Sequence, residues 1–299
     1  MFLVCTVPEL PEVETVRRGL QQATSNLTIA GGDVLLDRAI AYPQSASDFI
    51  AGIRGRTIAE WFRRGKYLLA RLDGPDTETP DPGEIAPAPH GWLGVHLRMT
   101  GQLLWLPRAT ELQKHARVRL FFPQERELRF VDQRTFGQMW WIPPNTDPAA
   151  IVTGLQQLGP EPFSTDFSTD YLVRRCRHRQ RPIKNALLDQ RLVAGAGNIY
   201  ADETLFLSQV RPTQPCGELS EGQIEAIRAN LVKVLQQAIE VGGTTFSSFL
   251  DVQGVNGNYA GIAWVYGRAG EPCRICGTII ERIKLAGRSS HFCPRCQSS

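Results

Sequence analysis

The sequence lacks any hydrophobic run that approaches the roughly 18 residues a membrane span needs, which argues against a transmembrane helix. Its first seven residues lack both the basic start and the length of a secretory signal. It shows no internal repeat, and a net charge of only +3 is weak evidence for a polyanionic partner. We therefore expect a soluble, cytoplasmic, globular protein whose partners must be inferred from its motifs.

Cysteine is scarce and unevenly placed. The chain has seven cysteines, and an odd number does not suit a framework of disulfides. Three are expected to be free thiols in a reducing compartment: Cys5, Cys176 and Cys216. The other four form two Cys-x-x-Cys pairs near the carboxyl end: Cys273 with Cys276, and Cys293 with Cys296.

The spacing of the two pairs predicts a metal site. Sixteen residues separate them, which fits four thiolates on one tetrahedral zinc with a β-hairpin between the pairs. Four protein ligands leave no position for water, so this zinc would be structural. The hairpin, with its turn at residues 286–287, is expected to present Lys284, Arg288 and His291 at its tip. Such ribbons often bind nucleic acid, although some only stabilise a fold.

The N-terminal half of the chain is predicted to be rich in β-strands. Short apolar runs alternate with turn residues from about residue 28 to residue 73, and further strands are expected at 92–97, 102–106, 116–122, 127–132 and 137–142. This pattern is typical of a sandwich or a flattened barrel. Residues 73–89 are rich in proline, aspartate and glycine, and we expect a mobile surface loop there.

Beyond the proline-rich linker at 143–148 the pattern becomes helical. Helices are expected at 166–177, 182–189, 200–208 and 218–240. The turn AGAGN at 194–198 is rich in glycine and could bring backbone N–H groups against a phosphate, or simply connect two helices. A second glycine- and asparagine-rich stretch at 251–261 is a candidate lid over a pocket.

The stretch PELPEVETVRRGL at residues 8–20 predicts a helix near the start of the chain, with Pro11 in its first turn. Its acidic residues, Glu9 among them, would be favoured by the positive end of the helix dipole without any catalytic role. The alternative is chemical, because a proline at a free chain terminus is a secondary amine that attacks electrophilic carbon without a base. Pro8 has such a nitrogen only without residues 1–7, and we hypothesise that Val7 is an initiator methionine, read from a GTG codon and removed.

Four features together produce a resemblance: this opening motif, the lysine of RRGKYLL at 63–69, GAGNIY at 195–200, and the four-cysteine hairpin. The chain closely resembles the formamidopyrimidine-DNA glycosylase family, bacterial base-excision enzymes that also nick the abasic strand. The resemblance covers residues 8–297 apart from the loop at 73–89. The motif PELPEVET separates this branch from the endonuclease VIII type.

The resemblance implies an α+β fold. An N-terminal antiparallel β-sandwich with flanking helices would be followed by a helix-two-turn-helix domain and a four-cysteine zinc-finger β-hairpin. The expected parts are a catalytic sandwich domain at 8–145, a linker at 146–163, the helical DNA-binding domain at 164–245, a lesion-recognition lid at 246–264 and the zinc finger at 265–299.

The resemblance also implies a catalytic set of four residues. Pro8, as the mature N-terminus, would attack C1′ of the damaged nucleotide, and the charged iminium formed would promote β- and then δ-elimination. Glu9 would be the acid and base for base departure and sugar opening. Lys66 matches a lysine that donates a proton during β-elimination, and Arg288 matches the zinc-finger arginine linked to δ-elimination. Without the resemblance, Lys66 would be interpreted as a solvated lysine at a strand end.

An enzyme that acts on a base inside a duplex must extrude it and fill the gap. The resemblance gives this role to Met99, Arg134 and Phe136, since apolar wedges replace stacking and the arginine offers donors to the orphaned cytosine. Taken alone, Met99 and Phe136 would be interpreted as core residues. The family's contacts to the DNA backbone match His115, Lys184 and Asn198.

The chain departs from the family pattern at Arg98, Thr135 and Gln180. Some relatives have glycine in place of Arg98, and many have a second arginine in place of Thr135, so both changes are expected to alter opposite-base preference or DNA affinity. Gln180 breaks a basic tract.

We therefore predict a bifunctional DNA glycosylase and AP lyase for oxidised purines such as 8-oxoguanine and formamidopyrimidines. Its partner would be double-stranded DNA containing such lesions or abasic sites, its one cofactor a structural Zn²⁺, and its state a monomer without membrane contact. Two rivals remain: a catalytically inert zinc-ribbon DNA-binding protein, if residues 1–7 persist, and an endonuclease VIII-like glycosylase for oxidised pyrimidines.

Overall fold

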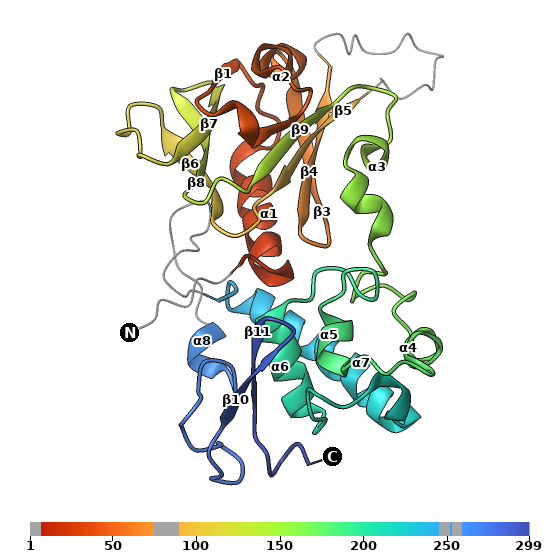
Figure 1. Cartoon of the computed structure of the whole chain (residues 1–299). Helices are drawn as coiled ribbons and strands as arrows, with labels where there is room; N and C mark the ends of the chain where they lie inside the picture. Colours follow the sequence, from red (N-terminus) through yellow and green to blue (C-terminus); the bar gives the residue numbers. More distant parts are fainter. Residues whose placement is uncertain (1–6, 75–89, 245–251, 253–258, 299) are drawn as a thin grey trace. The chain divides into compact units, whose positions relative to one another are not determined.

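The structure is a computed structural model that describes residues 7–74, 90–244, 252 and 259–298 (Figure 1). Most of the loop predicted at 73–89 and most of the predicted lid lie outside the described residues. Contacts divide the chain into two units. The N-terminal unit holds residues 1–8, 12–156 and 245–257, and the C-terminal unit holds residues 9–11, 157–244 and 258–299.

The N-terminal unit is built on two sheets. The five-stranded sheet has the order β2 (Ile40–Tyr42), β9 (Gln138–Ile142), β5 (Gly91–His96), β4 (Tyr67–Asp73), β3 (Thr57–Arg64). The four-stranded sheet has the order β1 (Gly31–Val34), β7 (Ala116–Phe122), β8 (Arg126–Asp132), β6 (Gly101–Pro107). The predicted sandwich is confirmed, except that β2 pairs with β9 in parallel rather than antiparallel.

Alternation along the strands explains why the sheets pack together. In β7 the residues at positions 116, 118, 120 and 122 are buried, and those between them are partly exposed. A strand places successive side chains on opposite faces, so one face of β7 joins the core and the other carries Arg117 and Arg119. Strands β4 and β9 are instead buried along most of their length. The five strands predicted between residues 92 and 142 hold to within one residue at each end.

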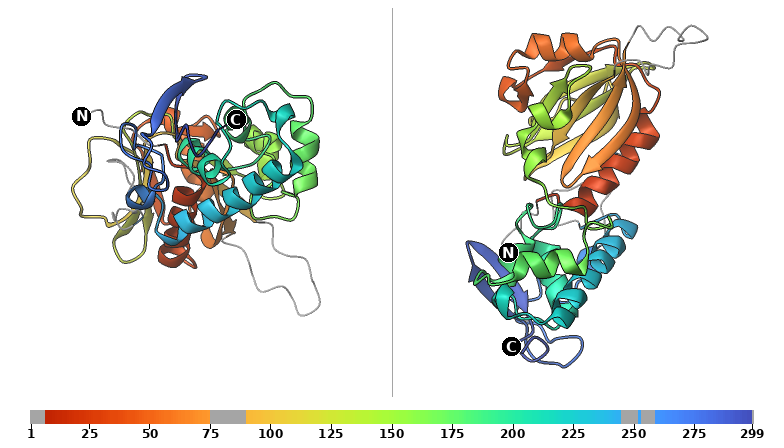
Figure 2. Two further views of the ribbon diagram at one scale, coloured as in Figure 1. Left: turned by 90° about the horizontal axis from the view of Figure 1, so that it is seen from below. Right: turned by 90° about the vertical axis from the view of Figure 1, so that its right-hand side faces the viewer.

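Helix α1 (Leu10–Thr24) begins as predicted, with Pro11 in its first turn. Its apolar face is fully buried: Val13, Val16 and Leu20 are each at most 1% exposed. Hydrogen bonds also hold the helix to β3, because the Trp61 backbone N–H donates to Gln21 Oε1 at 2.7 Å and the indole N–H donates to Thr24 Oγ1 at 2.9 Å. Figure 2 shows α1 alongside the strands of this unit.

Helix α2 (Ala46–Ile53) was not predicted, since the whole region from 28 to 73 was expected to form strands. Ser45 caps the helix by accepting a hydrogen bond from the Asp48 N–H. Phe49 and Ile53 are buried, four residues apart on one face. Eight residues give only two turns, too few for the helical period to stand out against the neighbouring strands.

The C-terminal unit is mainly helical. Its helices are α4 (Thr169–Cys176), α5 (Ile183–Leu187), α6 (Asn198–Leu207), α7 (Glu221–Glu240) and α8 (Tyr259–Ile262), with a 3₁₀ turn at Cys216–Glu218. A short helix, α3 (Pro148–Ile151), and a 3₁₀ turn at Thr153–Gln157 lie in the predicted linker. Among the described residues, no helix is long and apolar enough to cross a membrane.

Helix α6 is buried along nearly its whole length, charged residues included. Residues 199–206 are all buried. Glu203, without solvent exposure, accepts hydrogen bonds from the backbone N–H groups of Trp264, Val265 and Tyr266 at 2.7, 2.9 and 2.8 Å. Burial raises the pKa of this carboxyl, and the three amide donors oppose that rise. The segment that precedes the zinc hairpin is therefore fixed to α6.

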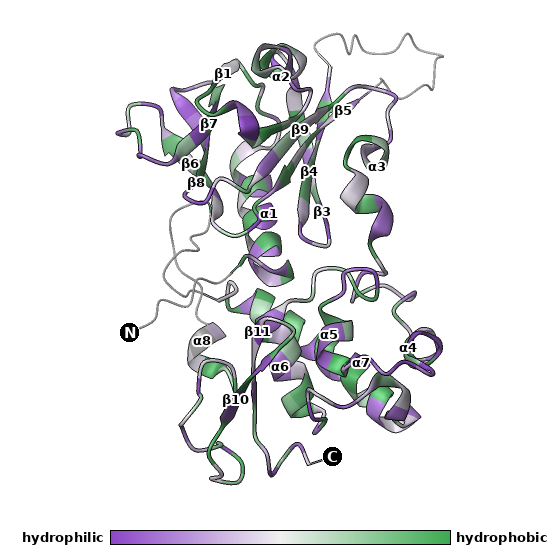
Figure 3. Cartoon of the chain, viewed as in Figure 1, coloured by the Kyte–Doolittle hydropathy of each residue, from purple (hydrophilic) through white to green (hydrophobic). Residues whose placement is uncertain are grey.

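Strands β10 (Glu281–Leu285) and β11 (Arg288–Phe292) form the predicted hairpin. Its turn is Ala286-Gly287, whose φ values of +46° and +81° belong to the left-handed region that a two-residue hairpin turn requires. The hydrophilic colour of β10 in Figure 3 agrees with its charged sequence ERIKL.

Candidate functional site

The four paired cysteines converge as the sequence predicts. Their Sγ atoms all lie within 4.8 Å of one another, and three Sγ pairs lie at 3.5, 3.5 and 3.9 Å. Zn–S bonds of about 2.3 Å in a tetrahedron place sulfur atoms about 3.8 Å apart, so the spacing suits zinc. The backbone N–H groups of Ile275 and Cys296 donate to Cys273 Sγ and Cys293 Sγ, as in metal-binding knuckles. These cysteines hold one structural zinc ion.

Glu9 is 4% exposed and lies against the amino end of α6. Its Oε1 accepts a hydrogen bond from the Ile199 N–H at 3.4 Å. A Cβ added at Gly197 would lie 2.0 Å from Glu9 Cδ, so only glycine leaves room for the carboxylate there. The positive end of a helix dipole favours a carboxylate at this place.

The glycine-rich turn before α6 packs against residues 9 and 10 of the same chain. Gly195 has φ +87°, and a Cβ on it would meet Leu10 Cδ1 at 2.5 Å. The Leu10 N–H donates to the Gly195 carbonyl at 3.1 Å. The turn was predicted either to approach a phosphate or to connect two helices, and in the structure it holds residues 9–10.

Lys184, predicted to contact DNA phosphate, is 1% exposed and forms a buried ion pair. Its Nζ lies 2.7 Å from Asp202 Oδ1 and donates to the Ser289 carbonyl at 2.6 Å. Burial lowers the pKa of Lys184, Asp202 opposes that shift, and the charge of Arg288 adds to it. An ammonium has three donors, so at most one of them remains for a phosphate oxygen. The phosphate contact stays a prediction.

Asp202 also holds strand β11. It accepts hydrogen bonds from Ser290 Oγ at 3.1 Å and from the His291 N–H at 2.9 Å, and its Oδ2 lies 3.2 Å from His291 Nδ1. The expectation that His291 stands at the hairpin tip is wrong, because this side chain is 5% exposed and faces α6. Arg288 and Lys284 are exposed as predicted.

Asn198 begins α6, and its amide shares a hydrogen bond with Tyr266. Burial raises the pKa of Tyr266 to about 12, with the negative charges of Glu9 and Asp202 adding to the effect, so its phenol stays protonated at neutral pH. Within the described residues Asn198 Oδ1 is buried and accepts no hydrogen bond. A buried oxygen of this kind could accept a hydrogen bond from a bound ligand.

The C-terminal unit thus gathers four of the predicted site residues: Glu9, Lys184, Asn198 and Arg288. Sequence reasoning missed three that connect them, namely Asp202, Tyr266 and Ser289. Asp202 and Tyr266 are polar residues in mostly apolar segments, and Ser289 lies in the polar segment RSSH, so the sequence does not say where the partner of any of them is.

In the N-terminal unit, Pro8 is buried and Lys66 is partly buried at the β3–β4 turn. His96, also missed from the sequence, lies within the electrostatic reach of Lys66. Its Nδ1 accepts a hydrogen bond from the Arg98 N–H at 2.9 Å. Burial, together with the charges of Arg98 and Lys66, lowers the pKa of His96 to about 3, so the imidazole is neutral at physiological pH.

The residues predicted to fill the gap in DNA lie on loops of the N-terminal unit. Phe136 is 53% exposed, so its interpretation as a core residue is wrong. The guanidinium of Arg134, also exposed, lies 5.3 Å from the centre of the Phe136 ring. Met99 and His115 are partly buried. Exposed apolar and cationic side chains in contact suit a partner with both stacked bases and charge.

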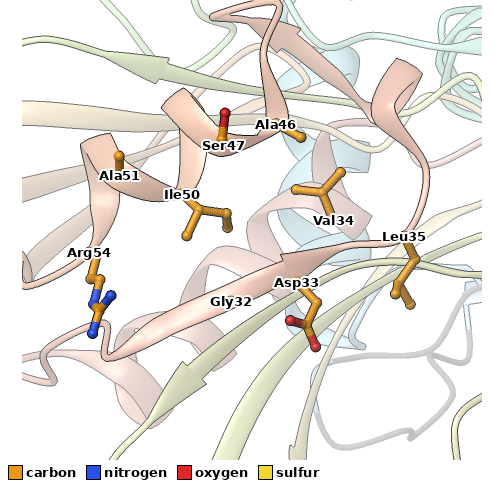
Figure 4. Close-up of a pocket in the computed structure, with 9 residues that line it drawn as sticks. All are labelled: Gly32, Asp33, Val34, Leu35, Ala46, Ser47, Ile50, Ala51 and Arg54. Carbon is orange, nitrogen blue, oxygen red and sulfur yellow. The ribbon is translucent and has the colours of Figure 1, made fainter.

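One surface hollow of the N-terminal unit lies between β1 and α2 (Figure 4). It is lined by Gly32, Asp33, Val34, Leu35, Ala46, Ser47, Ile50, Ala51 and Arg54. None of the predicted site residues belongs to it. Asp33 is already paired with Arg119 at 3.4 Å, so we assign no function to this hollow.

Comparison with known families gives three matches along the chain. Residues 7–139 match the N-terminal domain of formamidopyrimidine-DNA glycosylase, residues 158–250 match its H2TH domain, and residues 270–298 match the zinc finger found in FPG and IleRS. The first match begins one residue before Pro8.

Individual relatives agree over their whole length. A formamidopyrimidine-DNA glycosylase of Nostoc sp. (strain PCC 7120) is 60% identical over 291 residues, which are 97% of this chain and 100% of the relative. Among solved structures, Lactococcus lactis Fpg in complex with abasic-site DNA has a TM-score of 0.84 at 33% identity, over 97% of this chain and 100% of that one. MutM (Fpg) from Thermus thermophilus has a TM-score of 0.82 at 37% identity, over 98% of this chain and 99% of that one.

Proposed function

The chain belongs to the formamidopyrimidine-DNA glycosylase family, and we propose that it excises oxidised purines from duplex DNA and then cleaves the abasic strand by β- and δ-elimination. The single observation that carries the proposal is the placement of Glu9. A carboxylate next in the chain to Pro8 is held at the amino end of α6, on a glycine that leaves room for nothing larger. A general acid and base must be fixed within reach of its proton acceptor.

The nucleophile in this proposal is the Pro8 nitrogen. It attacks C1′ of the damaged nucleotide, and the bond from C1′ to the base breaks as the base leaves with a proton. The sugar opens to an iminium on the proline nitrogen, which carries its positive charge without a proton and acts as an electron sink. Loss of a C2′ proton then expels the 3′ phosphate, and a second elimination expels the 5′ phosphate.

The remaining catalytic roles follow from charge and position. Glu9 takes and returns protons while the base departs and the sugar opens. Lys66, within the electrostatic reach of a neutral His96, donates a proton during β-elimination. Arg288, exposed on the zinc hairpin, binds phosphate and assists the second elimination. The zinc ion stiffens the hairpin and takes no part in the chemistry.

For binding, we propose that Met99, Arg134 and Phe136 enter the gap left by the flipped nucleotide. The exposed Phe136 ring replaces a lost base stack, and Arg134 donates to the orphaned base. His115, Lys184 and Asn198 contact the DNA backbone, and Lys184 does so through the one ammonium donor that Asp202 and the Ser289 carbonyl leave. The cytoplasmic location and the monomeric state stay predictions.

Borohydride trapping tests the mechanism. Two forms are compared, one that starts at Pro8 and one that retains residues 1–7, each with 8-oxoguanine opposite cytosine and with thymine glycol duplexes. We expect a reducible covalent adduct only for the form with the free proline, and faster excision of 8-oxoguanine than of thymine glycol. Glu9→Gln serves as a second variant that keeps the amine and loses the proton carrier.

A form with a free Pro8 amine that gives no adduct with lesion-bearing DNA would overturn the proposal and favour a DNA-binding protein without catalysis. An adduct formed by the extended form would refute Pro8 as the nucleophile. Faster excision of thymine glycol would instead assign the chain to oxidised pyrimidines.

A further inference from the structure

Three strand ends of the four-stranded sheet meet at Asp132. It is the last residue of β8 and is the cross-strand partner of Gly101, the first residue of β6. Its neighbour Val131 is paired with Ala116, the first residue of β7. The loops outside these ends carry Met99, His115, Arg134 and Phe136, so all four side chains of this unit for which we propose DNA contacts leave the sheet beside one residue.

The Asp132 side chain is 1% exposed, and both of its oxygens are used by the loops. Oδ1 accepts hydrogen bonds from the Thr100 hydroxyl and, at 3.2 Å, from the Arg134 N–H. Oδ2 accepts from the Gly137 N–H at 2.7 Å. Thr100 Oγ1 in turn accepts from the Arg134 N–H at 2.9 Å. One carboxylate therefore ties the residue after Met99 to both ends of the loop 134–137.

The Asp132 backbone extends the same network to His115. Its N–H donates to the His115 carbonyl at 2.9 Å. Its carbonyl accepts from Arg117 Nε at 2.9 Å, and Arg117 Nη2 lies 3.1 Å from His115 Nδ1. Both the main chain and the imidazole of His115 are thus placed relative to Asp132.

The loop that Asp132 holds is strained. Thr135 has φ +58°, a left-handed conformation that a β-branched residue rarely adopts. A Cβ at Gly137 would meet Phe130 Cζ at 2.4 Å and Asp132 Oδ2 at 3.0 Å, so the chain there passes close to the carboxylate. A strained backbone persists only where surrounding contacts fix it. The Asp132 bonds at residues 134 and 137 bracket the strained residue.

We propose that Asp132 is a positioning residue for the gap-filling side chains, and that the preference for the base opposite the lesion depends on it. The inference rests on the proposed function and adds to it a residue that contacts no DNA. Because Asp132 sets the direction of Arg134 and Phe136 together with Met99, its loss changes all three at once.

The test is Asp132→Asn in the form that starts at Pro8. In either orientation of the amide, its NH₂ group faces a donor that bonded to a carboxylate oxygen in the wild type. At least one loop therefore loses its hydrogen bond to residue 132. The measurements are kcat/KM for 8-oxoguanine opposite cytosine and opposite adenine, and cleavage of a single-stranded abasic oligonucleotide, which has no gap to fill. We expect the cytosine preference to fall about tenfold, and single-strand cleavage to stay within about twofold of wild type.

Thr100→Val and Thr100→Ser provide an independent pair, since valine keeps the shape and loses the hydroxyl, whereas serine keeps it. Valine should lower the cytosine preference and serine should restore it. Leu120→Ala, a core truncation on β7, controls for stability alone and should lower the melting temperature with an unchanged preference.

An unchanged cytosine preference in both Asp132→Asn and Thr100→Val would overturn the inference, as would an equal loss in single-strand cleavage. The failure of the proposed function looks different. In that case the wild-type protein itself would neither excise 8-oxoguanine nor cleave abasic DNA, and the inference would fall with it.

Discussion

The ion pair between Lys184 and Asp202 offers a quantitative test of how the zinc hairpin is held. The two side chains are 1% and 0% exposed, and their charged atoms lie 2.7 Å apart. Asp202→Asn keeps the shape of the side chain and an acceptor for β11, but it removes the charged partner of a buried ammonium. Removal of one partner from a buried ion pair costs about 3–5 kcal/mol, and we expect the free energy of opening of α6 and β11 to fall by this amount in the variant.

The double variant with Lys184→Met separates the pair from its surroundings. With both charges removed, no buried ion is left uncompensated. The stability lost by the double variant should therefore be smaller than the sum of the two single-variant losses by about 2–3 kcal/mol. The exposed pair of Arg181 and Asp189, whose atoms lie 2.8 Å apart, is the matched control. Its coupling should not exceed about 1 kcal/mol because water screens it.

Hydrogen exchange followed by mass spectrometry suits this test, because the two units need not unfold together. Peptides from α6 and β11 of the zinc-loaded protein are followed at rising urea concentrations, which gives the free energy of opening for these elements. If the two single losses add up to the double loss within about 0.5 kcal/mol, the ammonium and the carboxylate are not coupled and the reasoning fails.

Three further outcomes are expected. Chelation of zinc should remove exchange protection from β11 and weaken DNA binding, and added Zn²⁺ should restore both; unchanged β11 protection in the metal-free protein would contradict this. His96 has a pKa of about 3 in the fold against 6.5 unfolded, so its contribution to stability is present above pH 6.5 and is lost as pH falls towards 3, by up to about 5 kcal/mol. His96→Gln should flatten urea-unfolding stability over this range, and an unchanged pH slope would refute the assignment. Gly197→Ala places a Cβ 2.0 Å from Glu9 Cδ and should lower base excision about 10²-fold, whereas Gly222→Ala, whose Cβ would meet Ser220 Oγ at an ordinary 4.0 Å, should leave excision unchanged.

The strands of the sandwich could be predicted because their information is local. The longer strands are apolar runs of five to eight residues, alternating in burial in β7 and almost continuously buried in β4 and β9, and turn residues separate one from the next. The parallel pairing of β2 with β9 could not be predicted in this way, since it joins residues about a hundred positions apart in the sequence.

In the candidate site, too, local patterns could be predicted from the sequence and contacts between distant residues could not. The four cysteines carry their own spacing rule, so their convergence could be predicted from the sequence alone. Asp132 and Asp202 carry no such rule. Asp202 contacts a hydroxyl 88 residues away, and Asp132 contacts one 32 residues away. A buried carboxylate becomes recognisable only when the fold supplies its donors.

Glu9 lies at the amino ends of two helices, and only one of them could be inferred from the sequence. It directly precedes α1, whose dipole could be expected from the sequence. The structure adds α6, whose second residue, Ile199, donates a hydrogen bond to the carboxylate. Glu9 of the opening motif and the glycine turn at 195–197 therefore form one structural feature, because any side chain at Gly197 would overlap the Glu9 carboxylate. The sequence of the turn is therefore explained by its contact with Glu9, which lies 188 positions earlier in the chain.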